Sequence, residues 1–328
     1  MKKIKILATG GTIAGRAASS TQLTGYTAGA YSVDDLLASV PALGELAQIS
    51  GEQLCNIDSS SITDALLLRL AQRCNELLAQ EDVDGVVITH GTDTMEETAF
   101  FLNLTVKSDK PVVLVGAMRP ATAVSADGPL NIINAVKTAV CAESAGQGVL
   151  VVMNDEIYGG RDVMKTNTAN VATFKAPNGG ALGCIVGGEV RYYYRSVRPH
   201  TLAAEFAISN VTALPRVDII YAHIGQDRVL VDAACAAGAR GLVYAGSGMG
   251  SIHGAVEAAL AEAVQSGVVV VRSSRTGSGR VSAGLARWQE QGFLYADNLN
   301  PQKARLLLQL ALLQTHERSE VQELLLRY

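Results

Sequence analysis

Short apolar runs, each followed by a turn rich in glycine or polar residues, recur along the first half of the chain. Continuous apolar runs of about four to eight residues are typical of strands buried on both faces, as in a parallel sheet. Apolar residues recur at helical spacing between these runs, so strands and helices are expected to alternate in an α/β fold. The expected buried strands are residues 4–8, 86–89, 112–115 and 149–152.

The same alternation returns in the second half after an interruption. Between about residues 187 and 215 the pattern gives way to Gly, Tyr and Arg, which indicates a linker or crossing connection. A chain of 328 residues is long enough for two domains. We therefore expect an N-terminal α/β domain over residues 1–190, a linker over 191–213 and a C-terminal α/β domain over 214–328.

Two helices have clear local boundaries. Ser32 is followed three residues later by Asp35, the spacing of a capping box, and Pro41 is expected to end that helix. Asn300 and Pro301 occupy the positions that those residue types favour at the start of a helix, which we expect to continue through residue 313.

Two of the glycine turns present a threonine. Thr12 follows Gly10 and Gly11, and Thr92 follows Gly91 and precedes Asp93. Ligands of open parallel sheets bind at the carboxyl ends of strands, and glycine lets the backbone approach a ligand closely. Each turn alone is equally typical of a tight strand exit, with Asp93 as a helix cap. Two such turns together favour a site, although the glycine spacing is not the dinucleotide-binding one.

Three further segments are candidates for the same site. Residues 58–61, Asp-Ser-Ser-Ser, come before a helix and are either plain caps or the binding site of an anion such as a carboxylate. Lys165 is either a solvated surface residue or, if desolvated, a proton acceptor. Residues 16–31 lack periodicity and leave the first turn directly, which favours a lid that carries Tyr26.

His90 suggests an alternative function, that of a serine hydrolase. Ser125 and Asp127 would complete a triad with it, but the chain has no G-x-S-x-G elbow, which disfavours this reading. The G-x-G-x-G spacing that begins at Gly246 is a weak nucleotide signal and is more typical of a tight strand–helix turn.

Composition and charge disfavour several classes of binding partner. The chain is 48% apolar and 18% charged with a net charge of −4, so a large core is expected and nucleic acid and anionic membranes are disfavoured as partners. The chain has no run of about 18 apolar residues, so no membrane span is predicted. The 5 cysteines lack CxxC spacing and predict neither a metal site nor a disulfide framework. The apolar run after Lys3 is too short for an export signal, and a cleaved one is left open.

Three motifs together carry a resemblance to a known family. They are Thr-Gly-Gly-Thr-Ile-Ala-Gly at 9–15, Ile-Thr-His-Gly-Thr-Asp-Thr-Met-Glu-Glu-Thr at 88–98 and Gly-Arg-Asp-Val-Met-Lys-Thr-Asn at 160–167. The chain resembles the bacterial L-asparaginases, particularly the type II and glutaminase-asparaginase branch. The likeness extends from Ile6 to Tyr328 and includes Leu-Asn-Pro-Gln-Lys-Ala-Arg at 299–305.

The resemblance implies an enzyme that hydrolyses L-asparagine to L-aspartate and ammonia without a cofactor or metal. It also implies a larger N-terminal α/β domain with a mostly parallel sheet, a smaller C-terminal domain, expected to be flavodoxin-like, and a homotetramer built as a dimer of dimers. Glutamine is a second candidate substrate. A glutamine-preferring amidase and an amino-acid-binding protein without catalysis are the alternatives.

The resemblance also implies a role for individual residues. Thr12 is the nucleophile and Tyr26 its partner on the lid, whereas Thr92, Asp93 and Lys165 form a second triad. The remaining expected contacts hold the substrate. They are Ser59 and the Gly91 backbone for the α-carboxylate, Asp93 for the α-ammonium, Ser60 beside them, and the backbone N–H groups of Thr92 and Ala117 for the oxyanion.

Departures from the family pattern concern specificity and compartment. Ser60 stands where the family has Gln or Glu to hold the amine, and residues 276–289 lack the glutamate that family members lend across the dimer. The ammonium is therefore expected to rest mostly on Asp93, with Asp58 as a second candidate. Ser251 replaces an Asn in a way found in branches that accept glutamine. Ser108 and Gln80 occupy the disulfide positions of exported members, which favours the cytoplasm over the periplasm.

Overall fold

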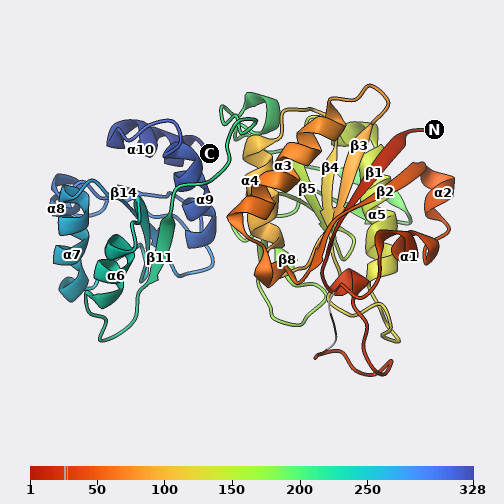
Figure 1. Ribbon diagram of the computed structural model, residues 1–328, viewed down its shortest axis with the longest axis horizontal. Helices are drawn as coiled ribbons and strands as arrows, with labels where there is room; N and C mark the ends of the chain where they lie inside the picture. Colours follow the sequence, from red (N-terminus) through yellow and green to blue (C-terminus); the bar gives the residue numbers. More distant parts are fainter. Residues whose placement is uncertain (26, 28) are drawn as a thin grey trace. The chain divides into compact units, whose positions relative to one another are not determined.

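The computed structural model describes residues 1–25, 27 and 29–328. The chain divides into two compact units, Met1–Asn210 and Val211–Tyr328, and Figure 1 labels the elements of each. Each unit has its own sheet with helices on both faces. The two-domain α/β organisation expected from the pattern of apolar runs is confirmed.

Five neighbouring strands of the N-terminal sheet are parallel, with β2 at the edge of the sheet. In spatial order β2, β1, β3, β4 and β5 lie side by side, and every neighbouring pair is parallel. The register places Ala8 opposite Thr89 and Thr89 opposite Val115, so the carboxyl ends of the central strands lie level. The bounds are β1 (Lys3–Gly10), β2 (Gln48–Ile57), β3 (Gly85–Thr89), β4 (Val112–Val115) and β5 (Val149–Met153).

The direction in which the chain crosses this sheet reverses once. From β1 it moves outward to β2, and it then returns past β1 to β3 and continues to β5. This 2-1-3-4-5 order is that of flavodoxin, and it creates a switch point between β1 and β3, where α/β proteins bind ligands. The flavodoxin-like order, which the sequence analysis expected in the C-terminal domain, thus occurs in the N-terminal one.

Helices cover both faces of this sheet. One face carries α1 (Val33–Ala38), α2 (Leu43–Leu46) and α5 (Gly128–Val140), and the other carries α3 (Asp64–Leu78) and α4 (Met95–Thr105) (Figure 1). The capping box at the start of α1 is present, because the Ser32 and Asp35 side chains each accept the other residue's backbone N–H. Short 3₁₀-helices lie at Thr12–Ala14, Ser59–Ser61, Ala142–Ser144 and Thr201–Ala203.

Antiparallel strands extend the sheet beyond β5. They are β6 (Glu156–Gly159), β9 (Gly183–Val186) and β10 (Glu189–Tyr192), and a separate ribbon pairs β7 (Met164–Lys165) with β8 (Phe174–Lys175). The first unit continues to Asn210, past residue 190, where the sequence analysis ended the domain. The reason is that β10 pairs with β9, and the Tyr193 and Tyr194 backbones then donate to the Leu182 carbonyl. Sheet pairing therefore keeps the start of this segment on the first unit, and side-chain bonds from Lys107 to the Ala204 carbonyl and from Gln72 to the Ile208 carbonyl hold its later part.

The C-terminal sheet is parallel throughout. Its strands β11 (Val217–Tyr221), β12 (Gly241–Gly246), β13 (Val269–Ser274) and β14 (Leu294–Tyr295) lie in chain order, so the crossing direction never reverses and the flavodoxin order is absent from these strands. The helices are α6 (Val229–Ala236), α7 (Gly254–Gln265), α8 (Ala286–Glu290), α9 (Pro301–Ala311) and α10 (Arg318–Arg327).

The start of α9 follows the expected local chemistry. The Asn300 side chain accepts the N–H of Lys303, and Pro301 is the first helical residue; the helix ends at Ala311, two residues before the expected end. Across the described part of the chain, no helix combines the length and apolar character that crossing a membrane requires.

Candidate active site

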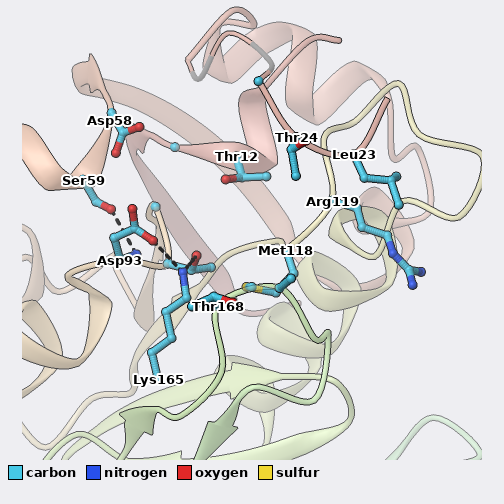
Figure 2. Close-up of a pocket in the computed structure, with 15 residues that line it drawn as sticks. Thr12, Leu23, Thr24, Asp58, Ser59, Asp93, Met118, Arg119, Lys165 and Thr168 are labelled. Atoms are coloured by element: carbon cyan, nitrogen blue, oxygen red, sulfur yellow. Dashed lines mark hydrogen bonds and ion pairs between the residues drawn. The ribbon is translucent and has the colours of Figure 1, made fainter. Parts of the chain in front are cut away.

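A cavity of about 520 Å³ opens at the carboxyl ends of the central strands of the N-terminal sheet. Residues that follow β1, β2, β3 and β4 line it, together with the turn after β7. The cavity therefore spans the switch point between β1 and β3. Among its lining residues are Thr12, Asp58, Ser59, Gly91, Thr92, Asp93, Met118, Arg119 and Lys165 (Figure 2).

The two threonine turns contact each other through their backbones. Gly11 has φ of +80°, and a Cβ there would lie 2.4 Å from the Cα and N of Gly91. A Cβ on Gly91 would in turn lie 2.5 Å from the Ser59 Oγ. No side chain fits at such distances, so glycine is required at both positions. This close approach brings Thr12 and Thr92 into one cavity, where each is more than nine-tenths buried.

Lys165 joins the second threonine turn from a distant part of the chain. Its Nζ donates to Thr92 Oγ1 at 2.9 Å and lies 2.5 Å from Asp93 Oδ1. The lysine side chain is 16% exposed, whereas that of Asp93 is 57% exposed. The lysine is therefore largely withdrawn from water, and its amine is held against a hydroxyl and a carboxylate from one turn (Figure 2).

A hairpin with an eight-residue connection, residues 166–173, presents Lys165. The Thr166 backbone N–H donates to the Thr173 carbonyl at 2.9 Å, and Asn167 Oδ1 accepts the N–H groups of Ala169 and Asn170, both at 2.9 Å. An asparagine that closes a turn on its own backbone makes the hairpin tip rigid. Thr168 at this tip also lines the cavity, a position that no sequence motif indicated.

The first two serines of the segment after β2, Ser59 and Ser60, make different contacts. Ser59 Oγ accepts the backbone N–H of Asp93 at 3.2 Å, and the Ser59 carbonyl accepts the Thr94 hydroxyl at 2.8 Å. Ser60 is exposed, and both its N–H and its hydroxyl donate to Asp58 Oδ1 at 3.0 Å. Ser59 thus lies in the cavity wall, and Ser60 fixes the carboxylate of Asp58, which also lines the cavity.

The loop after β4 is fixed by a carboxylate that faces its backbone. Asp127 accepts the N–H groups of Met118 and Arg119, each at 2.9 Å, and Asn131 Nδ2 donates to the Gly116 carbonyl at 3.0 Å. These bonds hold the backbone on both sides of Ala117, which is fully buried. The sequence analysis considered Asp127 only for a serine triad, because acids before a helix are usually caps.

The alternative triad of His90, Ser125 and Asp127 is not assembled. His90 Nδ1 lies 2.6 Å from the Gly91 carbonyl, and its Nε2 lies 2.9 Å from Thr98 Oγ1. The Ser125 hydroxyl instead accepts a bond from Arg119. Because a carbonyl can only accept, the Nδ1 of His90 carries the proton and the neutral ring receives the Thr98 hydroxyl. The histidine therefore supports the Gly91 turn from inside the fold.

Acid should destabilise the fold through His90. Complete burial lowers the pKa of His90 to about 4, whereas an unfolded histidine titrates near about 6.5. The unfolded chain therefore binds an extra proton between these values, and the free energy of unfolding should fall by about 3 kcal/mol as the pH drops from about 7 to 4. Urea unfolding across this range measures the loss.

Substitutions distinguish the effect of His90 on the pH dependence of the free energy of unfolding from the effect of the carboxyl groups. His90→Asn keeps a donor for the Gly91 carbonyl and should show a shallower dependence on pH, whereas His316→Asn, which changes an exposed histidine, should keep the wild-type dependence. Equal slopes in all three proteins would contradict the assignment.

Residues of the expected lid border the cavity. Leu23, Thr24 and Gly25 line it, and the segment is joined to the first turn by the bond from the Gly29 N–H to the Gly11 carbonyl, 3.1 Å long. Tyr26, expected as the partner of Thr12, lies outside the described residues.

Within the described residues, no group of three or more His, Cys, Asp or Glu side chains is placed to hold a metal ion.

Comparison with known proteins identifies the family. The family model described as Asparaginase, N-terminal, matches residues 3–198, and the model described as Glutaminase/Asparaginase C-terminal domain matches residues 216–325. The chain belongs to the asparaginase family. The asparaginase resemblance carried by the threonine and lysine motifs is thereby confirmed.

Relatives named as asparaginases match nearly the whole chain. L-asparaginase 2 of Bacillus subtilis is 51% identical over 98% of this chain and 85% of its own length. Glutaminase-asparaginase of Pseudomonas fluorescens is 43% identical over 100% of this chain and 91% of its own length. The crystal structure of a probable cytoplasmic L-asparaginase from Campylobacter jejuni matches with a TM-score of 0.98 at 50% identity, covering 100% of both chains.

Proposed function

We propose that this protein is an L-asparaginase that hydrolyses the side-chain amide of asparagine to aspartate and ammonia, with glutamine as a second substrate. One observation carries the proposal: two buried threonine hydroxyls from neighbouring turns share a cavity with Lys165, whose amine lies 2.9 Å from one of them. Relatives named L-asparaginase and glutaminase-asparaginase support the choice of these two amides.

The proposed reaction has two halves. Thr12 Oγ attacks the amide carbon and loses its proton to a base, the C–N bond breaks, and the amide nitrogen gains a proton and leaves as ammonia, so that an ester of Thr12 remains. Water then hydrolyses this ester to aspartate and restores the Thr12 hydroxyl. Threonine needs a base for the attack, and Thr92 with Lys165, or Tyr26, is proposed to accept the proton. Backbone N–H groups of Thr92 and Ala117 are proposed to stabilise the oxyanion. No step needs a cofactor.

Asparagine and glutamine hydrolysis test the proposal directly. Purified protein should release ammonia from asparagine, and the ratio of kcat/KM for the two amides separates an asparaginase from a glutamine-preferring amidase. Calorimetric binding of aspartate or asparagine without any ammonia release would instead support a binding protein on the same fold.

Two carboxylates are proposed to receive the substrate's α-ammonium. Asp58, Ser59 and Asp93 lie on one side of the cavity (Figure 2), and Ser59 with the Gly91 backbone is proposed to hold the α-carboxylate beside them. Asp93 already pairs with Lys165, so its charge is shared. Asp58 has no ion-pair partner among the described residues and is fixed by Ser60. Asp58 is therefore the main proposed anchor.

Asp58→Asn should raise the KM for asparagine by about ten- to a hundredfold with a smaller change in kcat, because a charge-assisted hydrogen bond to the ammonium is lost. Steady-state kinetics with asparagine and with succinamic acid, which lacks the α-amine, measures the effect. The KM for succinamic acid should stay nearly constant, and Asp34→Asn, on exposed Asp34 of α1, should leave both unchanged. Equal changes for both substrates would rule out an ammonium contact.

Assembly and compartment are further parts of the proposal. We propose a homotetramer, supported by large apolar side chains that the single chain leaves in water, including Val197 at 93% and Ile224 at 98% exposure. Light scattering on the purified protein measures the mass of the assembly.

We also propose a cytoplasmic location, supported by 5 cysteines that are all free thiols. Fractionation of the source cells tests this location.

A further inference from the structure

The position of Lys165 depends on a small structural unit. The lysine lies on β7, a strand of two residues that pairs only with β8 among the described strands and is not part of the eight-stranded sheet. Lysine also has a flexible four-carbon stem. Placing its amine against Thr92 therefore requires that the backbone of Lys165 be held to the element that carries Thr92.

A hydrogen bond joins these two elements at that point. Glu96 Oε2 accepts the backbone N–H of Lys165 at 2.6 Å. Glu96 is the second residue of α4, the helix that begins directly after the turn carrying Thr92 and Asp93. The segment from Thr92 to the first turn of α4 thus supplies the two groups that contact the lysine amine and the carboxylate that holds the lysine backbone.

Burial separates this carboxylate from an ordinary helix-start acid. An acid that only complements the helix dipole commonly lies in solvent, whereas Glu96 is 4% exposed. Water does not compete for a buried acceptor oxygen, so a hydrogen bond to it holds its donor firmly in place. The ion pair of Lys165 with half-exposed Asp93 is screened by water and holds position less firmly.

We propose that Glu96 is a positioning residue for catalysis, which keeps the Lys165 amine in register with Thr92 by anchoring β7 to α4. This inference rests on the proposed asparaginase function and adds a residue that does not touch the substrate. Its action depends on the reach of an acceptor oxygen rather than on the negative charge.

Two substitutions separate reach from charge. Glu96→Gln keeps an acceptor oxygen at the same reach and removes the charge, and it should retain kcat within about threefold. Glu96→Asp keeps the charge but is one methylene shorter, and it should lower kcat by about ten- to a hundredfold, since a displacement of about 1 Å costs that much. KM should change little, because Ser59 and Asp93 keep their places.

The kcat values are taken per folded site, counted by calorimetric titration with L-aspartate, so that a loss of folded protein does not count as a loss of catalysis. Hydrogen exchange of the peptide that contains Lys165 gives a second readout: Glu96→Asp should speed exchange of this amide and Glu96→Gln should not. Glu97→Asp makes the same shortening one residue later and should behave as the wild type.

Three results would overturn the inference. They are wild-type kcat in Glu96→Asp, a kcat in Glu96→Gln as low as in Glu96→Asp, or unchanged amide exchange in Glu96→Asp. Failure of the proposed function looks different, since wild-type protein would then release no ammonia while hydrogen exchange would still report the anchor.

Discussion

Thr12→Ala should lower kcat for asparagine by at least about a thousandfold, because losing a covalent nucleophile costs several orders of magnitude. The fold should survive the change, since the turn depends on the neighbouring Gly11, where a Cβ would lie 2.4 Å from the Gly91 backbone. Ammonia release measured under saturating asparagine gives the loss, and calorimetric titration with L-aspartate should still show binding.

The matched control for this substitution keeps the hydroxyl. Thr12→Ser should retain far more activity than the alanine variant, and hydroxylamine should trap an acyl-enzyme only where a hydroxyl is present. More than about a tenth of wild-type kcat in Thr12→Ala would exclude Thr12 as the nucleophile.

Lys165→Met should lower kcat by about a hundred- to ten-thousandfold, as expected when a general base is removed from its hydroxyl partner. Methionine has nearly the volume of the lysine stem, so the packing around the 16% exposed side chain should be kept. Single-turnover ammonia release separates the chemical step from binding, and the affinity for L-aspartate should change much less than kcat.

A second lysine of the same ribbon provides the control. Lys175 on β8 pairs with Glu156 at 2.8 Å and does not line the cavity. Lys175→Met should therefore stay within about threefold of the wild type. A drop in both variants to the same level would mean that the ribbon, rather than the lysine amine near Thr92, is what activity requires.

The strand exits were predictable because their signals are local. Runs such as 86–88 and 112–115 are apolar without interruption, and a glycine follows each within three residues, so the sequence places Thr92 and Ala117 just after strand ends. The start of α1 at Ser32 was predictable for the same reason, since a capping box involves residues only three apart.

Contacts between distant segments were less predictable. The sequence motifs placed Lys165 in the site only through the family resemblance, because the bond to Thr92 joins residues 73 apart. Nothing in the periodicity indicated Glu96, which has the sequence pattern of an ordinary helix-start acid. The place of Ser60 beside the substrate stays a prediction, and no motif indicated that its hydroxyl donates to Asp58.

By itself, the sequence determined the apolar runs of the central strands, the starts of α1 and α9, and which turns require glycine, because burial pattern and backbone conformation depend on neighbours in the chain. Only the tertiary structure decided the strand order, with its switch point between β1 and β3, and the anchoring of the Lys165 ribbon to α4. Those features depend on which elements pack together across long sequence separations. The close approach of Gly11 to Gly91, where a Cβ on Gly11 would lie 2.4 Å from the Gly91 backbone, joins both levels, since local glycine chemistry permits a contact that strand pairing creates.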